Sequence, residues 1–143
     1  MAAYRKVLVL LDLAAGSEKV YLAGRDIAAH SNAAIVALHV VEYIPVEPMG
    51  ESIMPSMQIE TSLTERSREL LAEFVSRYGP AGATARVEVG NTKAESLRVA
   101  EEEHADLIVL GSRERHGLAI LVNFTEDTVL HAAHCDVLAV RLS

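Results

Sequence analysis

Polar residues that directly follow apolar runs are the side chains of this sequence best placed to do chemistry. Asp12 ends the run Val7–Leu11, and a polar stretch that begins at Gly111 follows the run Leu107–Leu110. A carboxylate in the position of Asp12 can accept hydrogen bonds from a base or a ribose, or bind Mg²⁺, and it can equally cap nearby backbone N–H groups. The residue type leaves both interpretations open.

Motifs for phosphate binding and for nucleophilic catalysis are missing from the sequence. It has no Walker A motif, no G-x-G-x-x-G and no G-x-S-x-G elbow. Nothing in the sequence marks a histidine partner for Ser112, and His116 can be judged only in space. His131, His134 and Cys135 have a metal-like spacing, but they lie where a helix leads into a strand, so we interpret Cys135 as a small packed residue. We predict no catalytic residue and no metal site.

Composition limits the class of protein. The chain has 143 residues, of which 50% are hydrophobic, and this predicts one domain, residues 1–143, with a sizeable core. Its net charge of −7, from 13 basic and 20 acidic residues, argues against nucleic acid or an anionic membrane as a partner. No apolar run approaches the roughly 20 residues of a membrane helix. We predict a cytoplasmic protein that does not insert into membranes.

Apolar periodicity predicts the elements that position these residues. The expected strands are Val7–Leu11, Ala34–Val41, Ala83–Val89, Leu107–Leu110 and Val137–Leu142, with Ala83–Val89 at an edge. The expected helices begin at Ser17, near Ile59, at Thr92 and at Thr125; the second ends at Tyr78 and the fourth at His134. This alternation predicts an α/β fold, with a parallel sheet and helices on both faces.

Two further local patterns concern helix caps and a long connection. Ser17 is expected to cap the first helix, and Thr92 with Glu95 has the spacing of a capping box. The connection 42–57 is rich in Pro and Met, and long connections in compact domains are often functional. Its part Val46–Met57 is expected either to contact an unidentified protein partner or to pack as a lid on its own domain or dimer mate.

Four blocks of the sequence together resemble the universal stress protein family, in its UspA-like branch. They are the first strand running into Asp12, ALHVV at 37–41, ADLIVLGSRERHG at 105–117 and TVLHAAHCDVLAVRL at 128–142. The resemblance implies a single-domain, doubly wound, five-stranded parallel sheet of strand order 3-2-1-4-5, of the adenine nucleotide alpha hydrolase-like kind. It also implies a stress-response role and a homodimer paired through the last strand, at Val137, Leu138, Ala139 and Val140.

Nucleotide binders of this family carry a loop G-x-x-G-x9-G-[S/T] after the fourth strand. Gly111 and Thr125 match its first and last positions, whereas Glu114 and Phe124 replace its other two glycines. By resemblance, ATP or AMP with Mg²⁺ is the cofactor to consider, although none is certain. The nucleotide-binding positions that the resemblance implies are Asp12, Val40, Gly111, Ser112, Arg113 and Thr125.

The two replacements argue against a phosphate cradle of the usual kind. Glu114 adds a side chain and a negative charge, and Phe124 adds bulk, where glycine lets the backbone approach phosphate. We therefore predict a dimeric stress-response protein that acts through protein contacts without tight ATP binding. The alternative is a nucleotide-binding regulatory module in which Arg113, Arg115 and His116 of the divergent loop 111–125 hold phosphate through their side chains. A slow ATPase is the third hypothesis, and no acid–base set supports it.

Overall fold

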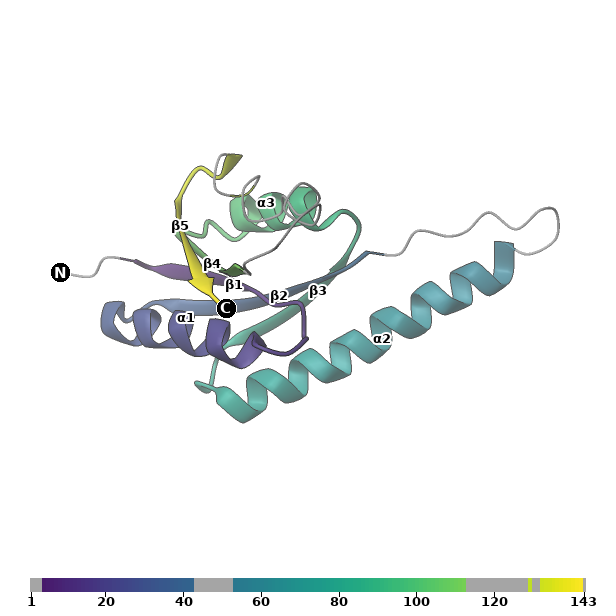
Figure 1. Cartoon of the computed structure of the whole chain (residues 1–143), viewed down its shortest axis with the longest axis horizontal. Helices are drawn as coiled ribbons and strands as arrows, with labels where there is room; N and C mark the ends of the chain where they lie inside the picture. The colour runs from purple at the N-terminus through teal and green to yellow at the C-terminus, as the bar shows by residue number, and fades with distance from the viewer. Residues whose placement is uncertain (1–3, 43–52, 113–128, 130–131, 143) are drawn as a thin grey trace.

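The computed structural model describes residues 4–42, 53–112, 129 and 132–142. Its strands are β1 (Lys6–Leu10), β2 (Ala34–Val41), β3 (Thr84–Val89), β4 (Leu107–Ser112) and β5 (Asp136–Arg141). Its helices are α1 (Ser17–Ser31), α2 (Ile53–Tyr78) and α3 (Thr92–Glu102). The strands form one sheet in the order β3-β2-β1-β4-β5, and every pair is parallel (Figure 1). The predicted fold class and strand order are confirmed.

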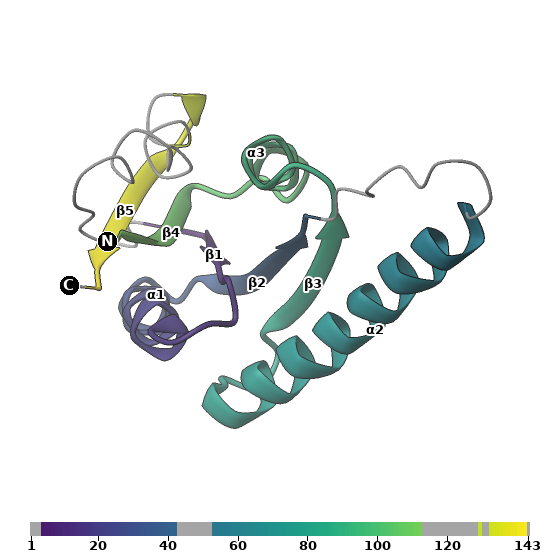
Figure 2. The same cartoon turned by 45° about the vertical axis from the view of Figure 1, so that its right-hand side comes forward.

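Alternate residues of the central strands face two separate apolar cores. Val7, Val9 and Leu11 turn toward the core that contains side chains of α1 and α2, whereas Leu8 turns toward the core beneath α3. Figure 2 shows this layering, with α1 and α2 on one side of the sheet and α3 on the other. Burial on both faces explains why the central strands are continuous apolar runs rather than alternating ones.

Three of the aromatic residues meet where α1 packs against the end of α2. Tyr21 of α1 packs edge-to-face on Phe74, with ring centroids 5.4 Å apart, and Phe74 in turn lies 4.8 Å from Tyr78. The Tyr21 hydroxyl donates to the carbonyl of Gly79 at 2.6 Å. These aromatic side chains thus pack the two helices together, and the buried Tyr21 hydroxyl has a hydrogen-bond acceptor.

Helix α2 begins earlier than the sequence pattern predicts. The sequence pattern places its start near Ile59, but the helix begins at Ile53, so that Pro55 lies in its first turn. Proline is tolerated in the first helical turn, where its missing N–H has no intrahelical acceptor to bond. Both views show the N-terminal half of α2 extending well beyond the sheet (Figures 1 and 2).

Several other predicted boundaries are wrong by one or two residues. Strand β4 includes Gly111 and Ser112, which the pattern assigns to a loop, and β5 begins at Asp136 and ends at Arg141. The last predicted helix does not reach His134, because helical backbone ends before Ala133. Polar residues at strand ends and small residues at helix ends carry little periodic signal, so such boundaries are the least predictable part of a pattern.

Candidate functional site

The carboxyl-terminal edge of the sheet gathers the residues predicted to bind a ligand. Strand β1 lies between β2 and β4, so the chain leaves it in opposite directions along the sheet and the strand order reverses there. Asp12 follows β1, Glu42 follows β2, and Gly111 with Ser112 ends β4. Ligands of open α/β sheets bind in the crevice at such a reversal, so this edge is the candidate site.

Asp12 is used within its own loop. Its Oδ1 accepts hydrogen bonds from the backbone N–H of Ala14 at 2.9 Å and from the hydroxyl of Ser17 at 3.0 Å. Ser17 is the first residue of α1 and does not cap it, which corrects the prediction: the N-cap is Gly16, in a left-handed conformation with φ 97°. The carboxylate therefore holds the turn that leads into α1, as the capping interpretation expects.

A second carboxylate occupies the N-terminus of α3. Glu42 accepts the backbone N–H of Thr92 at 2.6 Å, and this hydrogen bond holds the pKa of Glu42 below its usual range. The cap residue is Asn91, whose Oδ1 accepts the N–H of Ala94 at 3.0 Å, so the predicted Thr92 and Glu95 capping box is wrong. The helix end that faces this edge is thus already paired with a negative charge.

Gly111 has a structural reason to be glycine. A Cβ at this position would lie 2.7 Å from Cδ1 of Leu142 and 3.1 Å from Cγ2 of Val20. Contacts that short require neighbouring atoms to move, so the close approach of β4 to α1 and to the chain after β5 favours glycine here. This requirement exists without any phosphate.

Val40 and His39 occupy the end of β2 with different surroundings. Val40 is half-buried and packs against the core beneath α3. The Nδ1 of His39 lies 2.7 Å from the carbonyl oxygen of Leu11, which can only accept, so this nitrogen is the donor. This hydrogen bond joins β2 to the chain just before Asp12.

The remaining predicted site residues lie outside the described residues. These are Arg113, Glu114, Arg115, His116, Phe124, Thr125 and His131. Cys135 is half-buried and packs against the core beneath α3, as predicted, and burial followed by the charge of Asp136 raises the pKa of its thiol. Across residues 4–42, 53–112, 129 and 132–142, no group of three His, Cys, Asp or Glu side chains is arranged to hold a metal ion.

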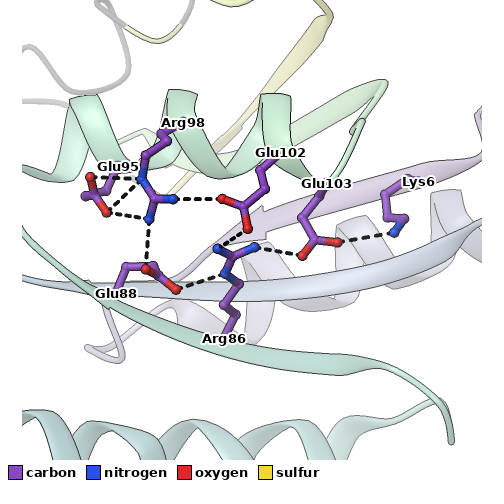
Figure 3. A network of polar contacts seen from close by, with 7 residues as sticks. All are labelled: Lys6, Arg86, Glu88, Glu95, Arg98, Glu102 and Glu103. Atoms are coloured by element: carbon purple, nitrogen blue, oxygen red, sulfur yellow. Dashed lines mark hydrogen bonds and ion pairs between the residues drawn. The ribbon is translucent and has the colours of Figure 1, made fainter.

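A charged network on the α3 side of the sheet was not anticipated from the sequence (Figure 3). Arg86 of β3 lies at its centre. The guanidinium donates to Glu88 at 2.9 Å, to Glu102 at 2.8 Å and to Glu103 at 2.8 Å. Lys6, at the start of β1, pairs with the other oxygen of Glu103 at 3.2 Å. These contacts connect the edge strand, the end of α3 and the first strand.

Arg98 extends the network toward the N-terminus of α3. It bonds Glu88 at 2.8 Å, Glu95 at 2.7 Å and Glu102 at 2.7 Å (Figure 3). The hydrogen bond from Arg86, followed by that from Arg98, holds the pKa of Glu88 below its usual range. The network orients α3, and with it the helix end bonded by Glu42.

Only part of this network has a signal in the sequence. Glu95, Arg98 and Glu102 are spaced three and four residues apart, which predicts ion pairs along one helix face. Arg86 and Glu88 alternate with apolar residues and read as the solvent side of an edge strand. That they face the same helix follows only from the tertiary fold.

None of the helices among the described residues is long and apolar enough to cross a membrane. A five-stranded parallel sheet of order β3-β2-β1-β4-β5, with helices on both faces, defines the chain as a doubly wound α/β protein. A family model described as the universal stress protein family matches residues 3–141. The chain belongs to the universal stress protein family.

Similar proteins extend over the whole chain. Universal stress protein A homolog 2 of Coxiella burnetii is 32% identical over 140 residues, which are 97% of this chain and 96% of the relative. Among solved structures, the universal stress protein UspA from Lactobacillus plantarum has a TM-score of 0.76 and 22% identity, covering 99% of this chain and 100% of its own. Another, a universal stress protein in complex with cAMP, has a TM-score of 0.69 and 21% identity, covering 99% of each chain.

Proposed function

We propose that this chain is a homodimeric stress-response protein that acts through protein contacts and does not bind ATP tightly. Membership of the universal stress protein family supports the stress-response role. One observation carries the argument about ATP. The carboxylates of Asp12 and Glu42 already accept N–H groups at the edge where a phosphate would need donors.

The sequence of the loop after β4 supports the same proposal. Glu114 and Phe124 stand where the family's nucleotide binders have glycine, and the retained Gly111 is explained by its contacts with Leu142 and Val20. The presence of Gly111 therefore does not itself argue for a phosphate. We further propose that residues 1–143 form a single domain of this family and that the protein is not an enzyme.

Native mass spectrometry of the purified chain tests the proposal. The chain is measured with and without Mg²⁺ and micromolar ATP, and we expect the dimer mass without stoichiometric nucleotide. The matched variant Glu114→Gly/Phe124→Gly restores the family's glycines and should gain ATP if these two side chains are what prevents binding. Stoichiometric ATP on the unmodified chain would refute the proposal.

A nucleotide-binding regulatory module is the second candidate function. One structural neighbour of this chain was solved in complex with cAMP, a nucleotide with a single phosphate and no need for a triphosphate cradle. Arg113, Arg115 and His116 can supply positive charge to such a phosphate. Repeating the same experiment with cAMP and with AMP distinguishes the two candidates. A nucleotide-binding regulatory module should bind one of these mononucleotides even though it does not bind ATP.

Assembly and partners complete the proposal. We propose a homodimer paired through Val137, Leu138, Ala139 and Val140 of β5, a cytoplasmic location, and a protein partner that contacts residues 46–57. The apolar stretch of β5 supports the dimer, and the projection of α2 beyond the sheet supports a partner contact on that side. Cell fractionation tests the location. A photo-crosslinker at position 57, compared with one at exposed Arg68, tests whether residues 46–57 are the contact.

A further inference from the structure

The outer edge of β5 presents only every second residue to a pairing strand. The N–H of Leu142 bonds the carbonyl of Ser112 at 2.8 Å, so the backbone groups of Leu142, and of Leu138 and Val140 before it, turn toward β4. In a parallel ladder the intervening residues turn the other way. Val137, Ala139 and Arg141 therefore direct their N–H and C=O groups away from the sheet.

One of these outward carbonyls is held by a lysine. Lys19, in the first turns of α1, donates from Nζ to the carbonyl oxygen of Arg141 at 2.8 Å. Its ammonium thus reaches around the edge of the sheet to the last residue of β5. A charged lysine at a strand edge obstructs the approach of another strand. Among the described residues, the stretch of this edge that Lys19 leaves to a pairing strand is centred on Val137 and Ala139.

The other edge of the sheet is less suited to pairing. Strand β3 carries Arg86 and Glu88 in its middle, and both are fixed by the network beneath α3. In β5 the charged residues stand at the two ends, Asp136 and Arg141, and the four residues between them are apolar. A strand from a second copy of this chain therefore meets β5 more favourably than β3.

We propose that Lys19 fixes the register of an antiparallel pairing between β5 and the β5 of a second copy. This inference rests on the proposed homodimer and goes beyond it. Antiparallel pairing about a twofold axis requires residues with outward groups to face one another. Val137 then pairs with the partner's Ala139, and Leu138 lies on the axis opposite the partner's Leu138.

The competing register is shifted by one residue on each strand. It pairs Ala139 with the partner's Ala139 and Val137 with the partner's Arg141. That arrangement has two more hydrogen bonds than the proposed register, because Arg141 also pairs with a residue of the partner's β5. It also requires the partner's Val137 to approach the Arg141 carbonyl that Lys19 occupies. The contact from Lys19 thus selects the register centred on Leu138.

Disulfide trapping in a Cys135→Ala background distinguishes the two registers. In the proposed register, Leu138→Cys places two thiols opposite each other in a non-hydrogen-bonded pair, with Cα atoms about 4.5 Å apart, within disulfide range. Ala139→Cys, the matched control, leaves its two Cα atoms roughly 9 Å apart, beyond that range. We expect a covalent dimer from Leu138→Cys alone. With Lys19→Met added, trapping should move to Ala139→Cys.

Each outcome decides between separate claims. Trapping at Ala139→Cys in the presence of Lys19 overturns the register and leaves the dimer intact. Trapping at Leu138→Cys that persists unchanged in Lys19→Met overturns the role of Lys19. A monomer by native mass spectrometry of the unmodified chain overturns the homodimer itself. If Leu138→Cys does not fold, Asp136→Cys/Val140→Cys reports the same register, because those two positions face each other across the axis.

Discussion

Replacing Gly111 with alanine tests whether this glycine is required by packing. The new methyl group would lie 2.7 Å from Cδ1 of Leu142 and 3.1 Å from Cγ2 of Val20. The Leu142 side chain can partly move, since it is only half-buried, whereas Val20 is buried and its β-branched side chain has little rotamer freedom. Overpacking of this kind predicts a loss of about 2 kcal/mol in the free energy of unfolding.

Urea unfolding followed by circular dichroism measures the loss in free energy of unfolding. The midpoint temperature of thermal unfolding should fall by about 8 °C for a chain of this length. The double-mutant cycle with Leu142→Ala provides the control, because removing the Leu142 side chain vacates the space that the methyl group needs. In that background the penalty of Gly111→Ala should drop below about 1 kcal/mol.

Two results would refute the reasoning. A Gly111→Ala protein as stable as the parent would mean that β4, α1 and Leu142 do not meet closely, and the glycine would again need a ligand to explain it. An equal penalty in both backgrounds would mean that the cost does not come from Leu142. No nucleotide is present in either measurement, so packing is tested separately from binding.

Three further substitutions test the other contacts. Arg86→Met removes the donor for three carboxylates, so we expect a loss of about 2 kcal/mol at low salt that becomes smaller in about 1 M NaCl; equal losses at both salt concentrations would contradict an electrostatic origin. Tyr21→Phe keeps the ring and removes only the hydroxyl bonded to Gly79, so urea unfolding should show a loss of about 1 kcal/mol. The pKa of Glu42 is lowered by its hydrogen bond from Thr92, so its stabilising effect is present above the ordinary value of 4.5 and is lost as the pH falls through the lower folded value. The stability difference between the parent and Glu42→Gln should therefore shrink from about pH 7 to about pH 3, and a constant difference would argue against this linkage.

The central strands were predictable because their residues face a core on both sides. Val7–Leu11 is an unbroken apolar run and Ala34–Val41 is interrupted only by His39, and a parallel sheet covered on both faces needs such runs. The start of α2 was not predictable from Pro55, because a proline can mark either the end of a helix or its first turn. The strand order came from the family resemblance, because periodicity alone does not rank strands along a sheet.

Contacts between residues distant in sequence account for the rest. Glu42 accepts the first N–H of a helix that begins 50 residues later, and Arg86 reaches Glu103 across 17 residues. Each side chain alone reads as an ordinary surface charge. Nothing in local spacing selects Glu42 over its acidic neighbours, so this part of the site emerges only when the sheet brings the ends of β2 and α3 together.

The two carboxylates at the sheet edge limit what an anionic ligand can gain there. A phosphate that displaced Asp12 or Glu42 would exchange one charge-assisted hydrogen bond for another, and the displaced carboxylate would stay nearby as a like charge. Net affinity would then have to come from groups that are not already bonded to the chain. The loop after β4 offers Arg113 and Arg115 but places Glu114 between them. We therefore expect the net charge of those three residues to determine how far the loop can offset the two carboxylates at the sheet edge.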